Sequence, residues 1–124
     1  MIFPEGTRFR KNCKQGLAKN REFAEKYNLP TFDLVLTPRH RGFYHSVQSL
    51  GSSLDAVYDI TIAYEPPEWT PDGTQPDIPS MASYLVGACR RLHIHLKRIP
   101  IDEVPKDEHK FTAWLCDRYK TKDE

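Results

Sequence analysis

The sequence predicts an α/β fold, in which helices flank a β-sheet. Segments with the 3.6-residue period of a helix alternate with strand-like segments, in the order strand, helix, strand, helix, strand, loop, strand, helix. The 124 residues are enough for one domain. Five of the ten prolines lie in one stretch, residues 65–79, which leaves the predicted elements on either side of it uninterrupted.

The first part of the chain is predicted to contain a strand end, a helix and a short strand. Residues 1–3 are interpreted as the end of a strand, because two apolar residues precede a turn. Apolar residues recur at helical spacing over 11–27, and Pro30 stops this helix. Residues 32–36 form an apolar run that predicts a short buried strand ending at Pro38.

The second part of the chain is predicted to add two helices and two strands. Residues 42–54 are ambiguous and are interpreted as a helix with one apolar face. Residues 56–64 and 93–99 alternate with a period of two, which indicates strands. The proline-rich segment 65–79 is predicted to be a long loop, either an insertion or a mobile surface segment rather than a domain linker. Residues 107–120 form an amphipathic helix at the end of the chain.

Composition excludes several classes of protein. Eighteen basic and seventeen acidic residues give a net charge of +1, so no long-range field attracts nucleic acid. The three cysteines, Cys13, Cys89 and Cys116, are widely spaced and form no CxxC pair, which favours reduced thiols in a chain that faces the cytosol. No apolar run approaches the ~18 residues that a membrane-spanning helix needs. His93 and His95 share one face of a predicted strand, but two histidines without a third ligand do not predict a metal site.

The most informative segment is Phe3-Pro4-Glu5-Gly6-Thr7-Arg8. A rigid proline, a permissive glycine and two opposite charges predict a turn that leaves a strand. Such a turn can aim the Arg8 guanidinium and a few backbone N–H groups at one point, which suits a phosphate. The alternative is a salt bridge between Glu5 and Arg8 that only closes the turn and contributes about 1 kcal/mol or less.

These six residues resemble the FPEGTR block of the glycerolipid acyltransferases. Further blocks similar to those of animal-type 1-acylglycerol-3-phosphate acyltransferases follow in the same order: Leu36-Thr37-Pro38-Arg39, Arg41-Gly42-Phe43, Ala56-Val57-Tyr58-Asp59, Arg98-Ile99-Pro100 and Ala113-Trp114-Leu115. The resemblance implies that the chain is the second half of a glycerol-3-phosphate-acyltransferase-like mixed sheet flanked by helices. Residues 1–124 would then be the C-terminal part of a single acyltransferase domain, whose N-terminal part is absent.

The resemblance also implies an activity and its site residues. The enzymes transfer an acyl chain from acyl-CoA, a co-substrate, to the free hydroxyl of 1-acylglycerol-3-phosphate, which forms phosphatidate. Glu5 and Arg8 would bind the acceptor's glycerol phosphate, and Thr7 and the amide of Gly6 would add donors. Pro38 would shape the acyl-donor pocket, or it is a proline that ends a strand without touching a ligand. No cofactor or metal is implied.

The family's catalytic base, a histidine in a His-x4-Asp motif, is expected to be missing from this chain. The residues five positions after the five histidines are His45, Leu50, Arg98, Pro100 and Trp114. The chain alone is therefore expected to be inactive, with an acceptor site but no catalytic residue. Two alternatives stay open: an acyltransferase for another lysophospholipid, or an inactive fragment that binds lipid phosphates or a protein.

The resemblance places the intact enzyme at the endoplasmic reticulum membrane, with this region facing the cytosol and the membrane reached through regions outside it. The basic cluster Arg39-His40-Arg41 has two interpretations. It could face lipid phosphates or CoA, but the start of a solvated helix is favoured.

Overall fold

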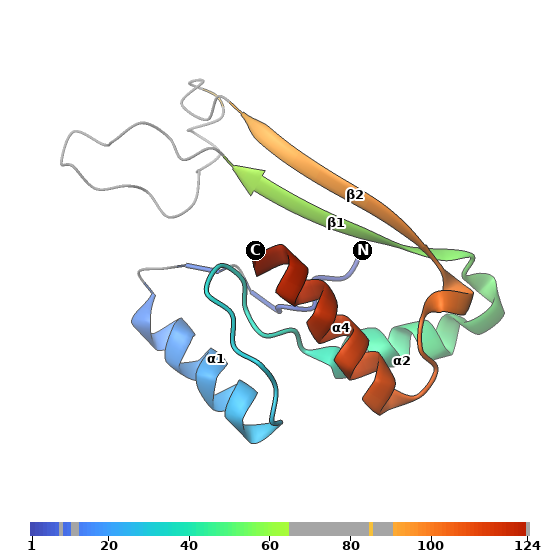
Figure 1. Ribbon diagram of the computed structural model, residues 1–124, viewed down its shortest axis with the longest axis horizontal. Helices are drawn as coiled ribbons and strands as arrows, with labels where there is room; N and C mark the ends of the chain where they lie inside the picture. The colour runs from blue at the N-terminus through green and yellow to red at the C-terminus, as the bar shows by residue number, and fades with distance from the viewer. Residues whose placement is uncertain (8, 11–12, 65–84, 86–90, 124) are drawn as a thin grey trace. The chain divides into compact units, whose positions relative to one another are not determined.

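The computed structural model describes residues 1–7, 9–10, 13–64, 85 and 91–123. The chain divides into two compact units, one formed by Met1–Val57 with Arg98–Glu124 and the other by Tyr58–Lys97. The described helices and strands, labelled in Figure 1, are α1 (Lys14–Lys26), α2 (His40–Leu50), β1 (Ala56–Tyr64), β2 (Leu92–Pro100) and α4 (Glu108–Asp123). Short 3-10 turns occupy Gly51–Ser53 and Ile101–Glu103.

The core of the first unit lies where α2 and α4 meet. Phe111 of α4 is completely buried. The centroid of its ring lies 5.2 Å from the ring centroid of Phe43 and 5.4 Å from those of Tyr44 and Trp114. The buried cluster consists of Val47, Ile99, Val104, Phe111, Leu115 and Tyr119. The predicted amphipathic helix at the end of the chain is confirmed, because α4 buries its apolar positions in this cluster.

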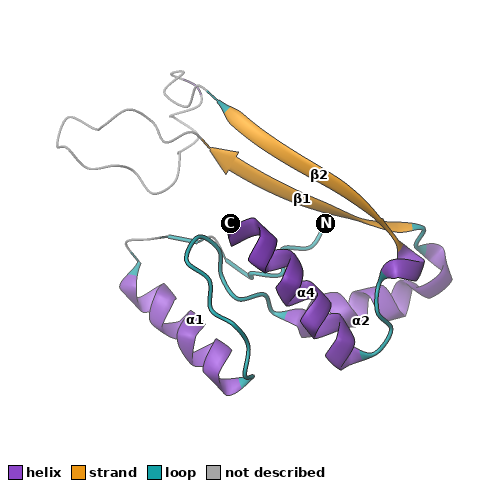
Figure 2. Ribbon diagram, viewed as in Figure 1, coloured by secondary structure: helices purple, strands orange, loops and turns teal. Residues whose placement is uncertain are grey.

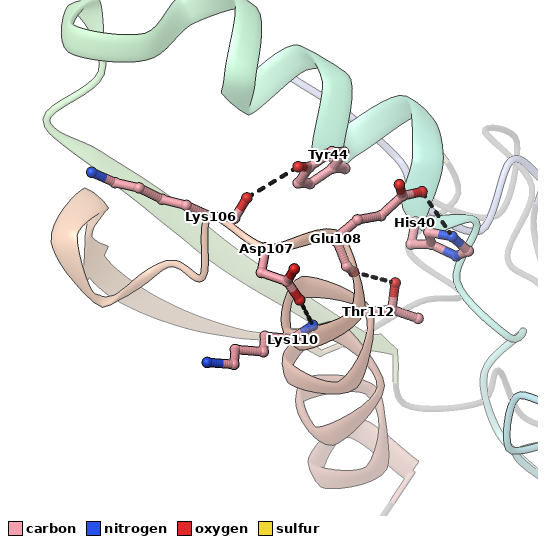
Figure 3. Close-up of polar contacts among 7 residues, drawn as sticks. All are labelled: His40, Tyr44, Lys106, Asp107, Glu108, Lys110 and Thr112. Atoms are coloured by element: carbon pink, nitrogen blue, oxygen red, sulfur yellow. Dashed lines mark hydrogen bonds and ion pairs between the residues drawn. The ribbon is translucent and has the colours of Figure 1, made fainter.

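Polar contacts fix the start of α4, and Figure 3 shows those of Tyr44 and Asp107. The Asp107 carboxylate accepts a hydrogen bond from the Lys110 N–H at 3.0 Å, as a helix cap does. The Tyr44 hydroxyl and the Gln48 amide of α2 both donate to the carbonyl of Lys106, at 3.0 and 3.3 Å. The same residues that precede α4 therefore also join it to α2.

The two strands form an antiparallel hairpin, drawn in orange in Figure 2. The strands predicted at 56–64 and 93–99 are confirmed, with β2 one residue longer at each end. Alternate residues leave one set of large apolar side chains exposed: Tyr58, Ile60, Ile62, Leu92, Ile94 and Leu96. Just outside the paired strands, before β1 and after β2, the Ile101 N–H donates to the carbonyl of Asp55 at 3.1 Å.

Two predicted strands are wrong. Residues 1–3 and 32–36 belong to no strand, because a strand needs a neighbouring strand and none pairs with them among the described residues. The N–H groups of Asp33 and Leu34 instead donate to the Asp123 carboxylate of α4, at 2.9 and 3.1 Å and at 2.6 Å. A side chain thus replaces the partner strand.

The remaining predictions agree with the structure in part. Helix α1 lies within the predicted 11–27, and Asn28 follows it with a positive φ of 49°. Helix α2 begins two residues before the predicted 42 and ends at Leu50. Helices combined with a sheet confirm the α/β class, while the larger mixed sheet stays a prediction. The predicted loop 65–79 lies outside the described residues.

Candidate functional site

The turn that opens the chain is well defined from Phe3 to Gly6. The Gly6 N–H donates to the Phe3 carbonyl at 3.0 Å, and Gly6 has a φ of +70°, in the left-handed region that favours glycine. The Gly6 amide, predicted as a ligand donor, is thus engaged in the turn itself. Thr7 is exposed beside it, and Arg8, the predicted phosphate ligand, lies outside the described residues.

Glu5 turns into the molecule rather than toward solvent. Its Oε2 accepts a hydrogen bond from the backbone N–H of Leu36 at 3.2 Å. Burial raises the pKa of the Glu5 carboxyl, and this hydrogen bond and the charge of Lys122 lower it by smaller amounts. The carboxylate therefore ties the turn to residues 36–39, which the sequence singled out as a separate block.

A second bond joins the same two segments. The Arg39 N–H donates to the carbonyl of Pro4 at 2.7 Å. Two bonds three residues apart, from Leu36 to Glu5 and from Arg39 to Pro4, hold the segments side by side. The structure therefore brings together two of the blocks that carried the family resemblance.

Helix α1 also contacts residues 36–39, through the side chain of Asn20. The Asn20 side chain accepts from the Thr37 N–H at 3.0 Å, and its Nδ2 lies 3.5 Å from the Thr37 hydroxyl. That hydroxyl donates to the Pro30 carbonyl at 2.8 Å. Thr37 and Pro38 are both almost completely buried. Pro38 thus has a packing role, and its contact with an acyl donor stays a prediction.

The predicted basic cluster at residues 39–41 does not act as one group. Arg39 is exposed, with its guanidinium over the ring of Phe23 at 5.2 Å. Arg41 lies over Tyr27 at 5.4 Å, and His40 between them is buried. The favoured interpretation, a solvated helix start, fits the start of α2 but not the burial of His40.

Sequence reasoning missed the closeness of Arg39 to the turn. A Cβ atom added to Gly6 would lie 3.5 Å from both Cδ and Nε of Arg39, so this side chain runs along the glycine. The contact depends on hydrogen bonds between residues more than thirty positions apart. No periodicity or local motif in one sequence reports such a pairing.

A separate cavity of about 340 Å³ lies in the first unit, lined by Tyr27, Leu29, His40, Arg41, Glu108, His109 and Thr112. His40 Nε2 lies 3.8 Å from Glu108 Oε1, as Figure 3 shows. Burial lowers the pKa of His40, and the carboxylate of Glu108 opposes this in part. The pair does not form a His-x4-Asp motif. Its histidine, His40, is on α2, and its acid, Glu108, is a glutamate on α4.

Two further findings concern the described residues only. They contain no group of three or more His, Cys, Asp or Glu side chains that could hold a metal ion. None of their helices is long and apolar enough to cross a bilayer.

Cys13 is exposed and Cys116 is buried, both as free thiols, and burial raises the pKa of Cys116. Cys89 lies outside the part that the structure describes.

Comparison with known proteins shows which proteins this chain is similar to. A family model described as the acyltransferase C-terminus matches residues 83–124. The chain is 38% identical over 99% of its length to the 1-acyl-sn-glycerol-3-phosphate acyltransferase epsilon of Mus musculus, and covers 33% of that protein. The chain is related to the glycerolipid acyltransferases. The family resemblance predicted from the sequence is thereby confirmed.

Two other relatives show the spread of this acyltransferase family. The lysocardiolipin acyltransferase 1 of Gallus gallus is 36% identical over the whole chain, and the probable 1-acyl-sn-glycerol-3-phosphate acyltransferase 5 of Arabidopsis thaliana is 35% identical over 99% of it. The chain covers 30% of each. It thus spans about a third of the length of the curated relatives it matches. No solved structure matches the chain.

Proposed function

We propose that this chain forms the acceptor-binding part of an acyltransferase that moves an acyl group from acyl-CoA to a lysophospholipid. The observation that carries the proposal is the joining of residues 3–7 to residues 36–39 by the Glu5–Leu36 and Pro4–Arg39 hydrogen bonds. A turn fixed at two points can hold a ligand group in one place, which a flexible terminus cannot. Relatives named as lysophospholipid acyltransferases support the same activity.

The proposed reaction sets the roles of these residues. The free hydroxyl of the acceptor attacks the thioester carbon, its proton passes to a base, and CoA leaves as the thiol. Arg8 binds the phosphate with two N–H donors, and Thr7 adds its hydroxyl. Glu5 acts one step away, because its carboxylate is occupied by the Leu36 N–H and holds the turn in place. Positioning of this kind lowers the entropic cost of the attack.

The base is proposed to come from outside these 124 residues. None of the five histidines is followed by an aspartate at the required spacing, and the matched relatives are about three times as long. The proposed acceptor is 1-acylglycerol-3-phosphate, since a guanidinium suits its terminal phosphate monoester. The names of the relatives also include lysocardiolipin acyltransferases, so another lysophospholipid is the alternative acceptor. The proposed location is the cytosolic face of the endoplasmic reticulum membrane.

The test is acyl transfer by the longest polypeptide that contains this chain, with radiolabelled acyl-CoA and a panel of lysophospholipids. We expect Arg8→Ala to lower kcat/KM for 1-acylglycerol-3-phosphate by about 10- to 100-fold, the effect of losing ~1.5–3 kcal/mol from a charged hydrogen bond. Arg10→Ala is the matched control, because Arg10 is an exposed arginine two residues further on. Equal activity of the two variants would contradict the phosphate role of Arg8.

A second candidate function is a module that binds lipid phosphates without catalysis. It is favoured by the presence of the turn in a chain without the His-x4-Asp motif. The purified 124-residue chain would then bind 1-acylglycerol-3-phosphate in a titration and transfer no acyl group. Binding that is equal for Arg8→Ala and the unaltered chain would contradict this candidate.

A further inference from the structure

We propose that Arg39 is a second cationic contact for the acceptor's anionic headgroup and sets the preference for a phosphate monoester. The inference rests on the proposed function, because it assumes that the headgroup binds at the turn of residues 3–7. Its own basis is the position of Arg39 beside the turn, because the sequence considered this residue only as part of the basic cluster 39–41 and favoured a solvated helix start.

The backbone of Arg39 is fixed against the turn. Its N–H donates to the Pro4 carbonyl at 2.7 Å, and three residues earlier Leu36 is bound to Glu5. From this anchor the side chain runs along Gly6, with Cδ and Nε both 3.5 Å from where a Cβ would stand. Glycine at this position therefore serves two purposes: it adopts the positive φ and leaves the arginine ordinary contact distance.

The guanidinium of Arg39 lies on a platform supplied by α1. It lies over the ring of Phe23 at 5.2 Å, a cation–π contact that orients the planar group. Three residues before Phe23, Asn20 binds the backbone of Thr37, so one face of α1 holds both the segment and its arginine. Arginine has five N–H donors, so those that do not face the Phe23 ring remain available to an anion.

The charge of Arg39 is not balanced by a neighbouring acid within the described residues. No carboxylate there forms an ion pair with it, and the side chain is exposed. The nearest carboxylate along the turn, that of Glu5, is directed to the Leu36 N–H. An exposed, oriented and uncompensated guanidinium is a favourable partner for a phosphate ester.

The chemistry of the headgroup gives the expected preference. A phosphate monoester carries about −1.5 to −2 charges at neutral pH, whereas a diester carries one. Two guanidinium groups, Arg8 and Arg39, match the greater charge and the three terminal oxygens of the monoester. Loss of Arg39 should therefore weaken monoester acceptors more than diester acceptors.

The experiment compares Arg39→Gln with Arg41→Gln in the longest polypeptide that contains this chain. Arg41 is the matched control, since it lies two residues away and its guanidinium lies over the ring of Tyr27. The probes are 1-acylglycerol-3-phosphate as monoester and lysophosphatidylinositol as diester. We expect Arg39→Gln to raise KM for the monoester about tenfold and KM for the diester less than threefold. KM for acyl-CoA should stay unchanged.

The outcomes separate this inference from the proposed function. A loss with Arg8→Ala and none with Arg39→Gln would overturn only the role of Arg39. No loss with either variant would overturn both. An equal loss for both acceptors and for acyl-CoA would show a merely structural role and overturn the inference. If Arg39→Gln does not fold, Arg39→Met decides, because it keeps an unbranched side chain beside the turn but removes the charge. A selective rise in monoester KM then supports the inference, and an unchanged KM overturns it.

Discussion

Residues 33–39 and the hairpin strands are both stretches of non-helical backbone, yet they satisfy their hydrogen-bonding groups differently. In the hairpin, β1 and β2 pair with each other. In residues 33–39, four backbone N–H groups donate to side chains of Asp123, Glu5 and Asn20, and a fifth to the Pro4 carbonyl. These partners lie up to 90 residues away in the sequence.

The difference teaches what each region depends on. The hydrogen bonds between paired strands join backbone groups, so they form with almost any side chains of suitable strand propensity. Paired strands therefore tolerate substitution. A segment held by side chains depends on a few specific residues, each of which can be lost in a single substitution. The proposed acceptor site lies in the second kind of region, which makes its geometry sensitive to residues that touch no ligand.

The largest effect should come from Asp123, whose carboxylate accepts from two backbone N–H groups. We expect Asp123→Ala to lower the free energy of unfolding by about 1–2 kcal/mol, because two backbone N–H groups lose their charged acceptor at an exposed site. Chemical denaturation measures the loss. Asp117→Ala is the control, because Asp117 is an exposed acid on the same helix. Equal stability of the two variants would contradict a stabilising role for the hydrogen bonds from Asp33 and Leu34 to Asp123.

The Glu5 carboxyl group gives the next effect, and the size of this effect depends on pH. Glu5→Ala should cost about 1 kcal/mol, since the Leu36 N–H loses its acceptor. Glu5→Gln keeps an acceptor oxygen and removes the buried charge, so it should be at least as stable as the unaltered chain at pH 7.

The pH dependence of that comparison follows from the raised pKa of Glu5. Because burial raises this pKa above its ordinary value of 4.5, its contribution to stability is complete below pH 4.5 and is lost as the pH rises through the folded-state pKa. Glu5→Gln should remove this decline. Denaturation curves at intervals between pH 4 and 8 measure it, and an identical decline in Glu5→Gln would show that another group causes it.

The contrast also explains which features the sequence predicted. The strands at 56–64 and 93–99 were predictable because alternation is local, and α4 because its apolar spacing is local. The strand predicted at 32–36 was wrong because an apolar run cannot show whether a partner strand exists.

For the site, the turn at Phe3–Gly6 follows from its proline and glycine. The pairing of Glu5 with Leu36, and the path of Arg39 along the turn, depend on distant contacts that no local pattern contains.

The smallest effect is expected in the hairpin. Thr61 lies within β1, and Thr61→Ala should lower the stability of the hairpin by no more than about 0.5–1 kcal/mol, because the backbone ladder remains and only strand propensity and packing change. Amide hydrogen exchange measures the effect strand by strand. Protection along β1 and β2 should persist in this variant, whereas Glu5→Ala should reduce protection at Leu36, whose N–H loses its acceptor. Loss of protection throughout the hairpin on Thr61→Ala would show that its side chains, rather than the ladder, hold it together, and the distinction between the two regions would not stand.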